Sequence, residues 1–125
     1  MSKVVVLTLS LILVSCSREQ PAPPPAPPAV TVAGDANRGR QLMTNYGCTG
    51  CHIIPGIDGP RVMLGPPLQS MGTRPAINRK IANTPQNMAQ WLRDPRSLDP
   101  DSTMPELGVT PVDATDMTAY LFSLR

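Results

Sequence analysis

Cys48-Thr49-Gly50-Cys51-His52 places two thiols two residues apart and follows them at once with an imidazole. This spacing is the attachment signature of a c-type haem. Cysteines so close together can each form a thioether to the same edge of one porphyrin. The next residue is then carried beneath the ring, where its imidazole reaches the iron. The pentapeptide therefore predicts one covalently bound haem c, with Cys48 and Cys51 as attachment points and His52 as an axial iron ligand.

Other chemistries of this pentapeptide fit less well. A structural zinc site usually needs four Cys or His ligands, whereas the chain has three cysteines and one histidine. A thioredoxin-like redox pair needs a βαβ context, which the neighbouring sequence does not offer. A plain disulfide between Cys48 and Cys51 is the remaining alternative, and it leaves His52 without a role.

Composition agrees with a small domain built around a cofactor. The 125 residues allow one small domain and include only four aromatic side chains, Tyr46, Trp91, Tyr120 and Phe122. Large aromatics normally supply much of a core, so a buried porphyrin would fill the deficit. From Cys16 onward the chain has ten Lys or Arg against nine Asp or Glu, which argues against a nucleic-acid partner.

Charged side chains form two groups along the sequence. The basic group is Arg74, Arg79 and Lys80, and the acidic group is Asp94, Asp99, Asp101 and Glu106. We interpret them as two solvated loop faces rather than as a docking patch.

Residues 1–15 predict an export signal, since Lys3 precedes an apolar run that is too short to span a bilayer. Leu13-Val14-Ser15-Cys16 resembles the lipobox of bacterial lipoproteins, in which the chain is cut before the cysteine and the cysteine is acylated. The alternative is an ordinary secretory signal in which Cys16 is incidental. We favour a lipid anchor at Cys16 on the periplasmic face of a bacterial membrane. Ser17 leaves the choice between inner and outer membrane open.

Residues 16–33 predict a tether. Pro21-Ala22-Pro23-Pro24-Pro25-Ala26-Pro27-Pro28 cannot form helix or sheet and favours a stiff polyproline II rod. At about 3.1 Å per residue, such a linker holds a domain roughly 50 Å from a membrane. A ligand for SH3-like domains has similar composition, but is not expected outside a cytoplasm.

The remaining residues, 34–125, predict an all-α domain with long loops. Asp35 is a candidate N-cap, and Gly39, Leu42, Met43 and Tyr46 share one helical face. From residue 53 to residue 81, dense Gly and Pro predict an irregular wrap.

Two later helices have the same starting signal. Thr84-Pro85 and Thr110-Pro111 each pair an N-cap with proline at the first helical position. Pro95 predicts the end of the first of these helices, followed by a loop over residues 96–109. Asp113 stands at the capping-box position of the second, which should continue to the C-terminus.

These elements resemble, in order, the class I cytochrome c family over residues 34–125. The resemblance is carried by five motifs: a glycine-bearing helix into Cys48–His52, Leu64-Gly65-Pro66-Pro67-Leu68, Trp91-Leu92-Arg93-Asp94-Pro95, Met104-Pro105, and Ala119-Tyr120-Leu121. It implies three to four helices and long loops around one haem. It also implies that the first and last helices cross closely at Gly39, with Tyr120 near the crossing. The chain is most similar to small bacterial monohaem forms, and Lys80 is its only lysine after the leader.

The resemblance also implies an iron ligand set. His52 is the only histidine, so a second histidine ligand from this chain is excluded. We choose Met104 as the second axial ligand. It matches the family's methionine position between the last two helices, and it lies in a polar loop where a core methionine is unexpected. Met63 and Met71 are the alternatives, whereas Met43, Met88 and Met117 lie on apolar helical faces and read as core.

Further roles follow from the same resemblance. Pro66 matches the family position whose carbonyl accepts the N–H of the axial histidine, and simple loop rigidity is the alternative. Trp91 corresponds to an aromatic beside the methionine–iron bond, and it could instead bind a propionate or be core. Arg74 is either a propionate partner or a solvated side chain, and we favour the second.

Two functions remain. The first is a one-electron carrier that is not an enzyme, because His52 and Met104 fill both axial positions. Its redox partners would be a terminal oxidase, a quinol-oxidising complex or a periplasmic dehydrogenase, with no small-molecule substrate. The second is a haem enzyme or gas sensor with an open sixth position, which requires that Met104 does not bind.

Cys16→Ala should block lipid modification of the chain. Without the thiol no thioether-linked lipid forms, and the precursor keeps its leader or is released by a less specific cleavage. Palmitate labelling and mass spectrometry of the N-terminus measure this. An unmodified mature chain that begins at another residue would contradict the lipid anchor.

Overall fold

The structure, a computed structural model, describes residues 32–60 and 63–125. The proposed signal, Cys16 and nearly all of the proline-rich tether lie outside these residues. Within them the helices are α1 (Ala36–Asn45), α2 (Pro85–Arg93), α3 (Pro95–Leu98) and α4 (Pro111–Ser123), with 3₁₀ turns η1 (Cys48–Gly50) and η2 (Met71–Thr73). The all-α prediction is confirmed: the only strand-like pairing in the described part is a single bridge between Ala76 and Ala82. None of the described helices is long and apolar enough to cross a bilayer.

Short polar side chains start the helices as predicted. The carboxylate of Asp35 accepts the backbone N–H groups of Asn37 and Arg38, at 2.8 and 3.2 Å. Thr84 and Thr110 each accept the N–H three residues on, at 3.1 and 3.2 Å, and a proline follows each of them. Each cap satisfies an N–H group that has no partner inside its helix.

The prediction for Pro95 is half right. Helix α2 does end before it, at Arg93, but Pro95 is the first residue of α3 rather than the start of a loop. Asp94 caps this short helix by accepting the N–H of Ser97 at 3.1 Å. Proline is tolerated at a first helical position because its missing N–H would be unpaired there anyway. The loop that carries Met104 therefore begins at Asp99.

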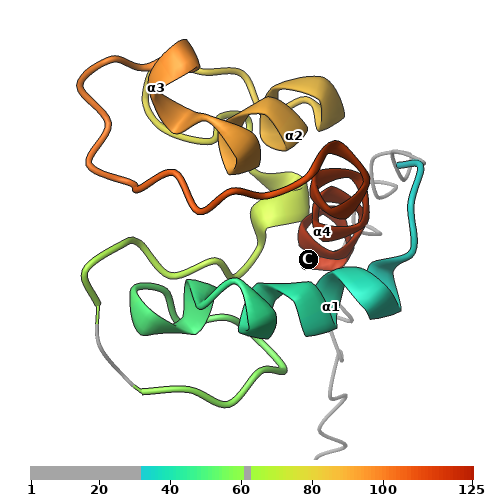
Figure 1. Cartoon of the computed structure of the whole chain (residues 1–125). Coiled ribbons are helices and arrows are strands. Elements are labelled where there is room, and N and C mark those ends of the chain that lie inside the picture. Colours follow the sequence, from blue (N-terminus) through green and yellow to red (C-terminus); the bar gives the residue numbers. More distant parts are fainter. Residues whose placement is uncertain (1–31, 61–62) are drawn as a thin grey trace, which may run out of the picture.

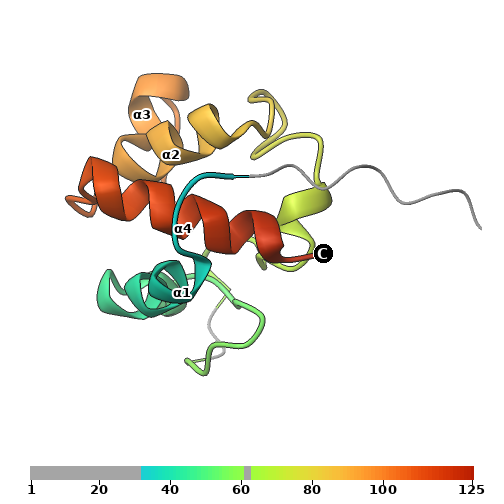
Figure 2. The same ribbon diagram turned by 90° about the vertical axis from the view of Figure 1, so that its right-hand side faces the viewer.

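Helices α1 and α4, although far apart in sequence, cross in close contact. Figure 1 looks along α4 while α1 runs across the view, and Figure 2 reverses the two. A Cβ on Gly39 would overlap the backbone oxygen of Asp116, so only glycine allows this approach. Tyr120, one turn further along α4, donates a hydrogen bond to the carbonyl of Pro55 at 2.5 Å. The close crossing expected at Gly39 is thus present.

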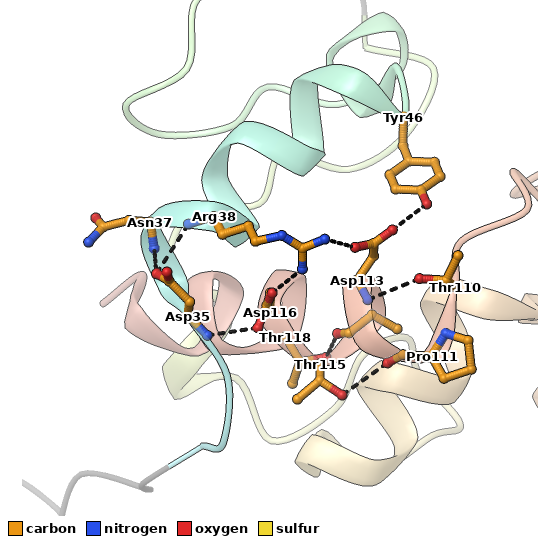
Figure 3. Close-up of polar contacts among 11 residues, drawn as sticks. Asp35, Asn37, Arg38, Tyr46, Thr110, Pro111, Asp113, Thr115, Asp116 and Thr118 are labelled. Atoms are coloured by element: carbon orange, nitrogen blue, oxygen red, sulfur yellow. Dashed lines mark hydrogen bonds and ion pairs between the residues drawn. The ribbon is translucent and has the colours of Figure 1, made fainter.

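A polar network fastens the two helices beside the crossing (Figure 3). Arg38 on α1 forms ion pairs with Asp113 and Asp116 on α4. Asp113 also accepts the hydroxyl of Tyr46 at 2.7 Å, and Asp116 accepts the backbone N–H of Asp35 at 2.8 Å. These donors hold the pKa of both carboxyls below the usual value, with Tyr46 the main cause for Asp113 and the Asp35 amide for Asp116.

The carboxylate of Asp113 thus joins α4 to α1, a role that the capping-box interpretation did not include. The N–H of Asp113 still bonds to Thr110, but its side chain is bonded to residues of the other helix.

The core lies where α4 faces α1 and α2. Helix α4 is buried along most of its length, from Asp116 to Phe122. Met43, Met88 and Met117 are 1%, 1% and 0% exposed, so the prediction that these three methionines are core residues is confirmed. Gly72 packs against the end of α4, where its N–H bonds to the carbonyl of Leu124 at 2.8 Å.

Gly39→Ala should destabilise the protein by about 2–3 kcal/mol, because the added methyl forces α1 away from Asp116. Helix propensity alone predicts the opposite sign, a gain of about 1 kcal/mol. Denaturant unfolding followed by circular dichroism measures the change. Thr44→Ala, at an exposed position of α1, is the control and should shift stability by less than about 0.5 kcal/mol. A gain in stability for Gly39→Ala would contradict the close crossing.

Candidate functional site

The pentapeptide forms a tight turn directly after α1. Gly47 has φ of 73°, a left-handed conformation that ends the helix and that glycine adopts without strain. The carbonyl of Cys48 then accepts the N–H groups of Cys51 and His52, at 3.2 and 3.0 Å. This turn directs both thiols and the imidazole to a single cavity.

Backbone groups hold the His52 ring in place. Its Nδ1 lies 2.7 Å from the carbonyl oxygen of Pro66. Because a carbonyl oxygen only accepts, Nδ1 must carry the proton, and Nε2 keeps a lone pair for a ligand. Gly65 lies against the same ring, where any Cβ would overlap it. The N–H of Gly65 bonds to the carbonyl of Cys51 at 2.9 Å, which ties the two segments together.

Met104 lies in an irregular loop that follows α3. Its side chain is half-buried and lines the same cavity as Cys48, Cys51 and His52. The N–H of Met104 donates to Ser102 Oγ at 3.2 Å, and the N–H of Ser102 donates to the carbonyl of Asp99 at 2.9 Å. Figure 1 shows the loop after Cys51 and the loop after α3 on the same side of α4, one below and one above it.

The cavity between these loops has a volume of about 570 Å³. Its wall is mainly apolar, with Met43 from α1, Met88, Trp91 and Leu92 from α2, and Leu121 from α4. Cavities of this size bury most of a small cofactor. Burial raises the pKa of the free Cys48 thiol, before any thioether forms, to about 11.

The other methionines in the wrap lie in contrasting positions. Met63 is 65% exposed and is not among the cavity-lining residues, whereas Met71 is 4% exposed and lines the cavity. The fold thus separates the two alternatives to Met104: only Met71 has a side chain in contact with the cavity.

The expectation of a solvated Arg74 is wrong. The residue is half-buried, and its Nη2 donates to the carbonyl oxygens of Pro67 and Gln69, at 2.7 and 2.8 Å. The guanidinium therefore binds the backbone of the segment that follows Pro66.

Sequence reasoning missed the polar rim of the cavity. Asn78 and Asp99 both line it, and their side chains are joined by a hydrogen bond of 3.0 Å. Lys80 Nζ lies 3.1 Å from Asp99 and 3.6 Å from Asp101. Lys80 of the basic group thus pairs with Asp99 and Asp101 of the acidic group, a contact that the interpretation as two loop faces did not include. Nothing in the sequence alone indicates that Asn78 and Lys80 pair with Asp99.

These features suit an iron porphyrin. The cavity brings together two thiols and an imidazole with its Nε2 free from one tight turn, and a thioether from a distant loop. Imidazole and thioether are both established haem-iron ligands. Among the described residues, no cluster of three or more His, Cys, Asp or Glu forms a competing metal site.

Two curated relatives match the chain over 91 residues. They are cytochrome c oxidase subunit 2 of Alkalihalophilus pseudofirmus, 34% identical over 72% of this chain and 26% of the relative, and cytochrome c oxidase subunit 2 of Bacillus sp. strain PS3, 32% identical over 68% and 25%. The chain thus matches only about a quarter of the length of these relatives.

Solved structures share the fold. Cytochrome c2 of Rhodobacter sphaeroides aligns with a TM-score of 0.57 at 21% identity, covering 74% of this chain and 97% of that one. Cytochrome c2 of Rhodobacter capsulatus aligns with a TM-score of 0.52 at 23% identity, covering 72% and 97%. The cytochrome c family model matches residues 36–125. With the helices, the CxxCH turn and the cavity in agreement, the chain belongs to the cytochrome c family, and its cofactor is covalently bound haem c.

Proposed function

We propose that this protein is a one-electron carrier, not an enzyme, in which His52 and Met104 bind the haem iron on its two faces. The observation that supports this most directly is the pairing within one cavity of a His52 ring with its Nε2 free and the side chain of Met104. With both axial positions filled by the chain, no position is left for a substrate. When bound, haem c supplies an iron that takes up and releases one electron.

The side chains have separate tasks in this proposal. Cys48 and Cys51 form the thioethers, and the Pro66 carbonyl fixes the tautomer of His52 and raises its basicity as a ligand. Met104 contributes a neutral thioether, which favours ferrous iron and raises the reduction potential. Apolar residues such as Leu92 and Leu121 exclude water from the cavity. Trp91 lines the same cavity as the proposed Met104 ligand.

The redox partner we propose is a terminal oxidase of a respiratory chain. Two relatives with the matching stretch are named as subunits of cytochrome c oxidase, which supports an oxidase over a dehydrogenase or a quinol-oxidising complex. We further propose that acylated Cys16 anchors the protein at the periplasmic face of a bacterial membrane, and that residues 16–33 serve as its tether. Crosslinking and co-purification from native membranes test the partner. Recovery of a dehydrogenase in place of an oxidase would contradict it.

Cys48→Ser or Cys51→Ser should each remove one thioether, leaving either no stable haem or a singly attached haem with a shifted spectrum. Extraction with acidified acetone measures covalent attachment directly. The unmutated protein should retain its haem under these conditions. Loss of haem from the unmutated protein would exclude covalent attachment at both cysteines.

Met104→Leu should open the sixth position with little change in side-chain volume. The ferric spectrum should lose the weak methionine–iron band in the far red and acquire high-spin character, and the reduction potential should fall. Met71→Leu is the matched control, since it removes a buried sulfur from the same cavity. Met63→Ala is the exposed control, and both should keep the band.

Two outcomes would contradict different parts of this proposal. If the band survives Met104→Leu and disappears in Met71→Leu, the carrier stands with Met71 as ligand. If the unmutated ferric protein lacks the band and its reduced form binds CO readily, the carrier function is wrong and the haem has an open sixth position.

A further inference from the structure

A small hairpin lies next to the loop that carries Met104. The Ala76–Ala82 bridge closes it, and the N–H of Ile77 bonds to the carbonyl of Ile81 at 2.9 Å. At its tip, Asn78 Oδ1 accepts the N–H groups of Lys80 and Ile81, at 2.8 and 2.9 Å. These bonds fix both the Asn78 side chain and the backbone of Lys80.

Two side chains of this hairpin hold one carboxylate. Asp99 is only 12% exposed at its side chain, and it accepts Asn78 Nδ2 at 3.0 Å and Lys80 Nζ at 3.1 Å. Lys80 also lies 3.6 Å from the exposed carboxylate of Asp101. The hydrogen bond to Asp99 is the main cause of the raised pKa of Lys80, so Lys80 stays charged at neutral pH.

Asp99 in turn begins the turn that leads to Met104. Its carbonyl accepts the N–H of Ser102 at 2.9 Å, and Ser102 Oγ accepts the N–H of Met104 at 3.2 Å. A continuous series of contacts therefore runs from Lys80 and Asn78 through Asp99 and Ser102 to the backbone of Met104. No regular secondary structure supports this loop from Asp99 to Thr110.

We propose that Lys80 and Asn78 are positioning residues that act through Asp99 to keep Met104 in the cavity and external ligands out of it. The inference rests on the proposed role of Met104 as an iron ligand. Irregular loops open locally at a lower free energy than the whole domain unfolds. A contact made only in the closed loop lowers the population of the open form, and a competing ligand binds in proportion to that population.

The increase in imidazole affinity on loss of the Lys80 contact should be small and specific to that contact. Lys80 is 63% exposed, and pairs of this kind change an equilibrium by about two- to fivefold. Since Lys80 lies outside the core, Lys80→Gln should still fold and carry haem. The ferric form of this variant should bind imidazole about two- to fivefold more tightly than the unmutated protein.

Imidazole is a suitable probe because it is neutral above its own pKa, so the loss of one positive charge has little direct effect on its binding. Arg79→Gln is the matched control: it removes the same charge one residue away, and Arg79 takes no part in the Asp99 contacts. Its imidazole affinity should equal that of the unmutated protein. Lys80→Arg keeps the charge and should bind imidazole as weakly as the unmutated protein does.

A double-mutant cycle separates positioning from general destabilisation. Asp99→Asn should raise imidazole affinity as Lys80→Gln does. The combined variant should raise this affinity by less than the product of the two separate factors, because both substitutions remove the same interaction. Equal imidazole affinity in Lys80→Gln and the unmutated protein would overturn the proposal, as would equal gains in Lys80→Gln and Arg79→Gln.

The far-red methionine–iron band of the unmutated ferric protein tests the ligand role of Met104 separately from the positioning role of Lys80. If the band is present and the imidazole affinities do not differ, only the positioning role of Lys80 is wrong. If the band is absent, the ligand assignment of Met104 is wrong, and the positioning role falls with it.

Discussion

The contact of α1 with α4 at Gly39 is the constraint on which the rest of the structure depends. Helix α1 leads directly through Gly47 into the turn that carries Cys48, Cys51 and His52, so its placement sets the position of the attachment turn. Helix α4 contributes Leu121 to the cavity wall. The network around Arg38 keeps the two helices from separating, because the paired carboxylates of Asp113 and Asp116 are held by donors from α1 and its ends.

The two sides of the cavity are held by different kinds of interaction. On the His52 side, backbone groups bond to backbone groups, and the Pro66 carbonyl fixes the ring. On the Met104 side, side chains such as Asn78 and Lys80 hold an irregular loop through Asp99. Exposed ion pairs such as that of Lys80 with Asp99 contribute only a little to stability. If one axial ligand exchanges, we therefore expect it to be the proposed ligand Met104 rather than His52.

The sequence predicts the parts of this structure that depend on local signals. The caps at Asp35, Thr84 and Thr110 were foreseeable because a short polar side chain before a helix has one clear role. Pro95 was ambiguous, since a proline that ends one helix can begin another. The partners of Asp113 and Lys80 were not foreseeable, because each pairs with residues many positions away. Long-range pairing of charges is decided by the fold and leaves no periodic pattern.

One further consequence follows from how the chain joins the domain. Val32 packs against the core, the N–H of Asp35 bonds to Asp116, and a Cβ on Gly34 would overlap the backbone of Thr115. None of these residues lines the cavity. The junction is thus held against α4 by residues that do not line the cavity. We therefore expect that the segment before Val32 can change in length, sequence or attachment while the residues that line the cavity stay in place.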